Sequence, residues 1–473
     1  MTHEPTSDVR PDRGRIPGPR GLELWRFLGR FRDRPFDRLL DLALEYGDIV
    51  MLDFPAERVV ILANPDYVEH VLHHRHQLYD KQTPNWKSVR QIWGYGLLTS
   101  DGDVWRRQRQ RMQPAFHQEA MKGFAAMVVE EARRISDIWA VSAAHGEARD
   151  VYQDMLVCAI RAISRAAFGS DIEGQHDVVI KALDEINHYI NPMALPNLMR
   201  VPQTVQRLLN PEYRRFRRAY ATINRILRDI VTRRLLASRD RGDLLGMIMY
   251  ATDDETSQPM TAAQLHDEMI NILMAGHETT GIATAWCWYW LSQNPDVERE
   301  LHAEVDRVLA GRLPGYDDLP NLPYTKMVFQ EAMRLTPPVW GLDRRAKEDD
   351  RIDGYRIPRG TYVAISPYLM HRHPKYWDMP EQFRPARFSA EAVAGRPQYA
   401  YLPFGGGPRR CIGMRFALLE GQLILALLAQ SFSVRLKPGQ KVVPEARLNL
   451  PPKYGVQMFL EPRRAAAVSP AAV

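Results

Sequence analysis

Apolar residues recur every three to four positions over several long stretches of this chain, which is the spacing of a buried helix face. The pattern predicts helices over residues 120–140, 149–168, 212–237 and 261–293. Near the N-terminus, β-branched and apolar residues flank Pro55, and residues 47–54 and 58–63 predict a hairpin. Residues 352–367 predict further short strands between glycine turns. The chain is therefore expected to be mainly α-helical with small β-sheets.

Residues 187–211 break the helical pattern. Prolines interrupt the apolar residues of this stretch, so it cannot form one helix. An apolar, proline-broken connection between two helices fits a mobile lid.

The segment FGGGPRRCIG, residues 404–413, places Cys411 behind a run of glycines and a pair of arginines and ahead of an apolar helix. The positive end of the helix dipole stabilises a sulfur anion. We expect the glycines to fold tightly and to turn their N–H groups toward that sulfur. Arg409 supplies a cation for an anionic group. The alternative is an ordinary buried thiol, which needs neither the glycines nor the arginines.

The spacing of five positions in this segment resembles the haem-binding signature of the cytochrome P450 family. These positions are Phe404, Gly407, Arg409, Cys411 and Gly413. The resemblance implies a triangular prism of about a dozen helices, with haem b (iron protoporphyrin IX) between a long central helix and the cysteine-bearing helix. Cys411 is the implied iron ligand, and dioxygen the implied co-substrate.

The longest predicted helix carries AGHETT in its middle, at residues 275–280. Thr279 can bond back to the carbonyl of Ala275 and loosen the helix there. A helix that kinks only for packing is the alternative. The sextet resembles the oxygen-binding groove of the family, which implies that Thr279 delivers protons with Glu278 as relay. His277 has no second histidine at helical spacing, and we interpret it as a non-ligand.

Trp105 and Arg109 lie four residues apart on a basic helix, so both can face one anion. A surface cation is the alternative for the arginine. The spacing resembles the family helix that holds a haem propionate, and Arg344 aligns with a further propionate arginine, although Arg345 adjoins it. The cofactor contacts implied by the resemblance are Trp105, Arg109, Arg344, Phe404, Arg409, Cys411 and Gly413.

Glu331 and Arg334 lie three residues apart on a predicted helix. Alone, this spacing indicates only a solvated surface pair, as we expect for Glu304 and Arg307. The later FRPARF segment resembles the family segment that brings a second arginine, here Arg387, onto the glutamate. The resemblance implies a buried network of Glu331, Arg334 and Arg387 with a structural role.

The resemblance also implies a substrate pocket with an aromatic and aliphatic lining, which favours a lipophilic ligand. Its residues are Ile92, Trp93, Tyr95, Leu97, Ile272, Ala275, Gly276, Val339 and Trp340. The expected reaction hydroxylates or epoxidises a fatty acid, terpenoid, steroid or macrolide-like compound. A peroxide-driven, isomerising or dehydrating haem enzyme is one alternative, and a haem sensor or carrier is another.

Composition limits the remaining possibilities. The three cysteines are widely separated, which excludes a disulfide framework and fits a reducing cytoplasm. The N-terminus is polar, without the apolar core of a signal peptide or a membrane span. A formal charge of +6 is too modest to favour nucleic acid. We expect a flexible arm at 1–20, a single haem domain at 21–464, a disordered tail at 465–473, and a monomer.

No flavin or iron–sulfur cluster is expected in this chain, because only about 60 residues follow Cys411 and they contain no further cysteine. Electrons would therefore come from an acidic ferredoxin or flavodoxin with its NAD(P)H reductase. The expected docking residues are Arg106, Arg107, Arg111, Arg410 and Arg415. A solvated face is the alternative for each of them.

Overall fold

The computed structural model describes residues 13–31, 35–55, 57–172, 174–190, 204–205, 212–237, 241–253 and 258–463. Most of the predicted lid, most of the N-terminal arm and the whole C-terminal tail lie outside these ranges. The four residues 187–190 belong to the last turn of a helix.

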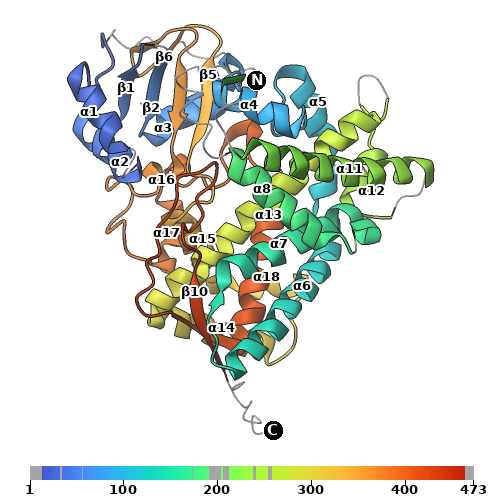
Figure 1. Ribbon diagram of the computed structural model, residues 1–473. Helices are drawn as coiled ribbons and strands as arrows, with labels where there is room; N and C mark the ends of the chain where they lie inside the picture. The colour runs from blue at the N-terminus through green and yellow to red at the C-terminus, as the bar shows by residue number, and fades with distance from the viewer. Residues whose placement is uncertain are drawn as a thin grey trace.

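Helices make up most of the molecule (Figure 1). They are α1 (Leu22–Phe31), α2 (Pro35–Tyr46), α3 (Pro65–Glu69), α4 (Pro84–Trp93), α5 (Gly102–Met112), α6 (Gln118–Ala144), α7 (Val151–Phe168), α8 (His176–Ile190), α11 (Tyr213–Ala237), α12 (Leu244–Met249), α13 (Ala262–Gln293), α14 (Pro295–Leu309), α15 (Pro323–Leu335), α16 (Pro367–Met370), α17 (Ala390–Ala394) and α18 (Met414–Ser431). The four predicted long helices are confirmed as α6, α7, α11 and α13.

The strands form small sheets at the edges of the helical body. They are β1 (Ile49–Asp53), β2 (Arg58–Leu62), β3 (Tyr79–Asp80), β4 (Arg149–Asp150), β5 (Leu342–Ala346), β6 (Asp350–Ile352), β7 (Tyr355–Ile357), β8 (Tyr362–Ile365), β9 (Phe432–Leu436) and β10 (Gln457–Pro462). The largest sheet has the order β1-β2-β8-β5-β3, and β2 pairs with β8 in parallel. The predicted N-terminal hairpin is confirmed as the antiparallel pair β1 and β2.

Helix α13 is the centre of the fold. A capping box between Thr261 and Gln264 starts it, and most of its side chains are buried all round, because α7, α11, α15 and α18 pack against it. The helical core surrounds it, while a second apolar cluster fills the space between the largest sheet and α1 to α3. None of the described helices is both long and apolar enough to span a membrane.

The interpretation of Glu304 as half of a solvated surface pair is wrong. This side chain is buried, and its carboxylate accepts the backbone N–H groups of Tyr324 and Thr325 at 2.8 and 2.7 Å. Both donors lie in the first turn of α15, so a carboxylate from α14 caps that helix. Spacing within one helix gave no sign of this contact between two helices.

Candidate functional site

Cys411 lies on the loop just before α18. Its backbone N–H donates to the carbonyl of Phe404 at 2.9 Å, which closes the glycine turn. Its side chain is exposed to solvent, yet desolvation by the surrounding protein raises the pKa of the thiol. The backbone N–H of Gly413, Arg109 and Arg410 act in the opposite direction and favour the anion. A thiol that is both exposed and desolvated lies at the base of a recess.

The glycine run allows two close approaches. Gly407 has φ +63°, and a Cβ there would lie 1.8 Å from the carbonyl oxygen of Leu72. A Cβ on Gly406 would lie 2.3 Å from the ring of Tyr399. Any side chain at either position would push the cysteine loop away from its support.

For two of the three glycines, the expectation that their N–H groups turn toward the sulfur is wrong. The N–H of Gly405 donates to the Leu402 carbonyl at 3.0 Å, and that of Gly407 donates to the Tyr399 hydroxyl at 3.2 Å. The backbone donor to the sulfur is Gly413, which follows the cysteine. The glycines therefore act by shape, and the residue after them acts by hydrogen bonding.

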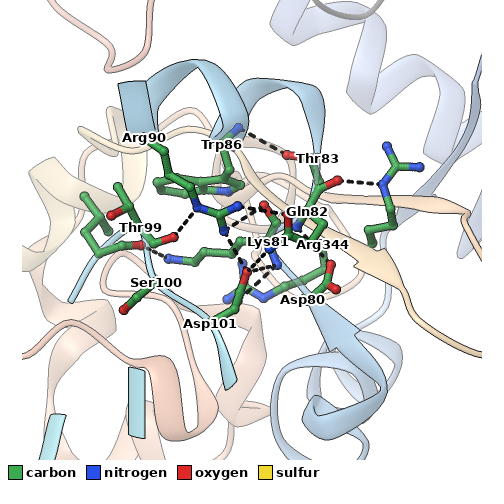
Figure 2. A network of polar contacts seen from close by, with 12 residues as sticks. Asp80, Lys81, Gln82, Thr83, Trp86, Arg90, Thr99, Ser100, Asp101 and Arg344 are labelled. Atoms are coloured by element: carbon green, nitrogen blue, oxygen red, sulfur yellow. Dashed lines mark hydrogen bonds and ion pairs between the residues drawn. The ribbon is translucent and has the colours of Figure 1, made fainter. Parts of the chain in front are cut away.

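Asp101 lies in a cluster of cations that includes Arg90, Lys81 and Arg344 (Figure 2). Arg90 of α4 and Arg409 of the cysteine loop donate to its carboxylate at 2.7 and 2.8 Å. The backbone N–H of Lys81 also donates to it, at 3.1 Å. The guanidinium of Arg409 lies 4.3 Å from the centroid of the Trp105 ring. The predicted residues Trp105 and Arg409 are thus in direct contact.

Two cations of this cluster, Lys81 and Arg344, form no ion pair with any carboxylate in the described ranges. Both side chains are buried. The ammonium of Lys81 donates to the Leu98 carbonyl at 2.5 Å, and Arg344 donates to the carbonyl of Asp343 at 2.7 Å. Desolvation lowers the pKa of both groups, and the charges of Arg344 and Arg409 lower the pKa of Lys81 further. Buried cations without a carboxylate partner indicate a site for an anion.

The adjacent residues Arg344 and Arg345 have different partners. Arg345 donates to the carboxylate of Glu57 at 2.9 Å and to the carbonyl of Gln82 at 2.9 Å, so its guanidinium is already bound within the sheet. Arg344 instead lies close enough to Arg409 to lower its pKa, which desolvation brings to about 10. Arg344 is therefore the arginine that belongs to the cluster.

Arg109 lies at the cysteine end of the same surface. Its guanidinium donates to the carbonyl of Arg410 at 2.8 Å. Desolvation lowers its pKa, and the nearby Cys411 raises it. Helix α5 therefore reaches the cysteine loop through both residues of the predicted pair.

On α13, the hydroxyl of Thr279 donates to the carbonyl of Ala275 at 2.7 Å, as expected. Glu278 beside it is buried, and its carboxylate accepts the side-chain N–H of Asn449 at 2.5 Å. Desolvation raises the pKa of Glu278 to about 7, while Asn449 and Arg447 oppose the rise. A carboxyl group that titrates near neutral pH can both give and receive a proton. Asn449 had no motif by which the sequence could reveal it.

Two neighbours of Thr279 have packing roles. A Cβ on Gly276 would lie 2.7 Å from Ile163 of α7, so the absence of a side chain lets α13 and α7 approach closely here, and its place in the substrate pocket stays a prediction. His277 is buried, its Nδ1 lies 3.0 Å from the Leu273 carbonyl, and desolvation lowers its pKa to about 4. A neutral, internally bonded imidazole agrees with the non-ligand interpretation.

The other predicted pocket residues divide into two groups. Ile92, Trp93 and Ile272 are buried, and Leu97, Ala275 and Val339 are half-buried. Ile92 also lines a cleft of about 800 Å³ between α4, α8 and α11, with the stacked rings of Tyr189 and Phe216 on its wall. The same cleft is also lined by Arg217, Arg225, Arg228 and Asp229, so its lining is mixed and does not by itself select a lipophilic molecule.

Two of the predicted pocket side chains lie elsewhere. Tyr95 is 65% exposed and contributes its backbone rather than its ring. The ring of Trp340 packs edge-on against Phe36 at 5.3 Å and donates to the carbonyl of Arg447. These contacts direct Trp340 toward the N-terminal helices.

Glu331, Arg334 and Arg387 form a buried ion network. Two donors of Arg334 bind the two carboxylate oxygens of Glu331 at 2.7 and 2.8 Å, and neither side chain is exposed. Arg387 approaches the same carboxylate at 3.3 Å. Arg334 also donates to the carbonyls of His371, Pro380 and Gln382. The network thus joins α15 to the segment that leads to the cysteine loop.

The expected docking surface is smaller than the sequence indicated. Arg107 and Arg111 both pair with the buried Asp253, at 3.7 and 3.0 Å, so one carboxylate offsets one of their two charges. Arg410 and Arg415 are exposed on either side of Cys411 along the chain.

Comparisons with known proteins agree with this geometry. The family model for cytochrome P450 matches residues 16–458. The chain is 36% identical to cyclooctatin synthase of Streptomyces melanosporofaciens over 94% of this chain and 95% of that protein. It is 31% identical to cyclooctat-9-en-7-ol 5-monooxygenase of the same organism, over 88% and 87%. The crystal structure of the cytochrome P450DA heme domain superposes with a TM-score of 0.85 at 27% identity, over 96% of this chain and 99% of that one.

Proposed function

Because this chain belongs to the cytochrome P450 family and is therefore a haem-dependent monooxygenase, we propose that it oxidises a terpenoid with electrons from separate redox proteins. The expected fold class, mainly α with small sheets around a haem site, is confirmed by the superposition on a P450 heme domain. The observation that carries the proposal is the recessed thiol of Cys411 beside buried cations that lack carboxylate partners.

The residues present fit haem b. The Cys411 thiolate would bind the iron, with Gly413 and Arg109 stabilising its charge. Lys81, Arg344 and Arg409 would hold the propionates, because they supply buried positive charge for two carboxylates. When bound, the haem supplies the activation of dioxygen and the transfer of one oxygen atom to the substrate.

Proton delivery would fall to Glu278 and Thr279. The Glu278 carboxyl is buried next to Thr279 on the helix and titrates near pH 7. Asn449 fixes one of its oxygens, which leaves the other free to exchange protons. The Thr279 hydroxyl, anchored on Ala275, would present its oxygen to the reacting centre.

A terpenoid substrate is supported by two observations. Ile92, Trp93 and Ile272 are apolar and buried, and we expect them to form part of the wall of the site. Two relatives that cover most of this chain are named for cyclooctatin and cyclooctat-9-en-7-ol. An acidic ferredoxin or flavodoxin remains the proposed electron donor, with Arg410 and Arg415 as the exposed cations near the thiolate.

The test is optical. The purified protein is reduced with dithionite and exposed to carbon monoxide, for the wild type and Cys411→Ala. A strongly red-shifted Soret band in the wild type that is lost in the variant supports thiolate ligation. Terpenoid hydrocarbons and alcohols are then screened for a spin-state shift. A well-folded, haem-loaded wild type without the red-shifted band would refute the proposal.

A further inference from the structure

The loop between α4 and α5 is bound to one turn of α13 through its backbone. The N–H of Tyr95 donates to Asp267 at 2.8 Å, and the N–H of Leu97 donates to Glu268 at 2.8 Å. The N–H of Leu98 donates to Asn271 at 3.2 Å. Consecutive acceptors on a single helical turn therefore hold a short stretch of loop.

The sequence of the loop permits this close docking. A Cβ on Gly94, which has φ +67°, would lie 2.3 Å from the carboxylate carbon of Asp267. A Cβ on Gly96 would lie 2.5 Å from the side-chain nitrogen of Asn271. The side chain of Asn271 also donates to the carbonyl of Trp93 at 2.7 Å. The loop and the helix turn are thus fitted to each other at both glycines.

Glu268 differs from the other two acceptors because it is fully buried and has no cation partner among the described residues. Its Oε2 accepts the Leu97 N–H, while its Oε1 is buried without a hydrogen-bond partner. Desolvation raises its pKa to about 8, and the nearby charge of Asp267 adds to the rise. Burial therefore favours the protonated, neutral form of this carboxyl group, and the proposed proton relay does not use it.

The position of Glu268 on α13 connects this contact to the substrate site. Ile272, Ala275 and Thr279 follow it at intervals of four, three and four residues, which is the spacing of one helix face. Ala275 lies about 10 Å further along the helix axis, since seven residues rise 1.5 Å each. Glu268 thus ends the row of residues that leads to the oxygen groove.

We propose that Glu268 is a specificity-determining residue, which fixes the 93–98 loop against α13 and so sets the size of substrate that fits beside Leu97. The inference rests on the proposed function, because it concerns the substrate site of that reaction. A glutamine at this position keeps the acceptor for the Leu97 N–H and introduces no charge, so it should keep the 93–98 loop in place against α13. An alanine removes the acceptor and leaves a space.

The test compares Glu268→Gln, Glu268→Ala and a matched control in the full-length, haem-loaded protein. The control is Glu304→Ala, which removes another buried glutamate that accepts backbone N–H groups, on α14. Dissociation constants are measured from the spin-state shift for a monoterpene, a sesquiterpene and a diterpene hydrocarbon. Hydrogen exchange of the Leu97 amide is measured in parallel, and it requires no substrate.

Glu268→Ala should change the ratio of the monoterpene and diterpene constants by about tenfold, the effect of losing one buried hydrogen bond. Its Leu97 amide should exchange faster. Glu268→Gln should keep the wild-type ratio and exchange rate, and Glu304→Ala should lower only stability. The inference would be overturned if Glu268→Ala left the ratio of the monoterpene and diterpene dissociation constants unchanged. It would also be overturned if Glu304→Ala changed that ratio by the same factor.

A failure of the proposed function can be distinguished from a failure of this inference. If the proposed function is wrong, the wild type will lack the red-shifted carbon monoxide band. The amide exchange measurement would then still decide whether Glu268 holds the loop, since wild-type exchange rates in Glu268→Ala would overturn that contact by themselves.

Discussion

Replacing Lys81 with methionine should have different effects on the apoprotein and on haem retention. The buried ammonium has no carboxylate partner in the described ranges and is repelled by Arg344 and Arg409. Methionine keeps the length of the side chain and removes the charge. Exchanging a buried charge for an apolar group commonly stabilises a protein by about 1–4 kcal/mol.

The loss of one hydrogen bond limits this gain. The Leu98 carbonyl, which now accepts from the Lys81 ammonium, would be left without that donor, at a cost of about 1–3 kcal/mol. We therefore expect the apoprotein of Lys81→Met to lie between about 2 kcal/mol less stable and about 3 kcal/mol more stable than the wild type. Haem should dissociate about tenfold to a hundredfold faster, because a charge-assisted contact to a propionate is lost.

Two measurements check this prediction. Urea unfolding of the apoprotein gives the free energy of unfolding. Transfer of haem to excess apomyoglobin gives the dissociation rate. Lys347→Met, which removes an exposed lysine just after β5, is the control and should change neither quantity. A large loss of apoprotein stability in Lys81→Met, or an unchanged rate of haem release, would show that Lys81 does not face the cofactor.

Three further changes test other parts of the site. Glu278→Gln should reduce the fall in unfolding free energy that the wild type shows between about pH 4.5 and 7, because the folded protein keeps a proton on Glu278 that the unfolded chain loses there, while Glu268 contributes a further fall in both proteins; unfolding at several pH values measures it, and identical profiles would contradict the assigned pKa. Arg334→Leu should cost about 3–5 kcal/mol, since it removes the bidentate partner of the buried Glu331 and leaves only Arg387 near that carboxylate, and a midpoint of urea unfolding close to that of the wild type would contradict this. Charge reversal at Arg410 and Arg415 should slow reduction by an acidic ferredoxin about tenfold and weaken its salt dependence, whereas reversal of the exposed Arg217 on α11 should not; equal rates in stopped-flow measurements would remove this surface from consideration.

The sequence predicted those parts of the site that depend on short-range spacing. Cys411 and Gly413 lie within one motif, and Thr279 reaches Ala275 within one helical turn. The long helices followed from apolar periodicity, because a helix face repeats at a fixed interval. These features are local, so a linear pattern contains them.

Contacts between distant segments could not be predicted in this way. Lys81 is a lone lysine without a spacing signal, and its environment arises only when the segments around Arg344 and Arg409 fold beside it. The sequence around Gly276 gives no sign that this residue packs against Ile163 of α7. Asn449 reaches Glu278 across 171 positions of sequence. Burial and partner choice at these residues are properties of the tertiary fold.

The parallel pairing of β2 with β8 also affects how this protein is made. These strands lie about 300 residues apart along the chain, so a ribosome must synthesise most of the protein before the largest sheet can close. Lys81 and Asp101 emerge early, whereas Arg344, Arg409 and Cys411 emerge late. The nascent chain therefore cannot retain its cofactor during most of translation, and haem loading becomes a late step in the synthesis of this protein.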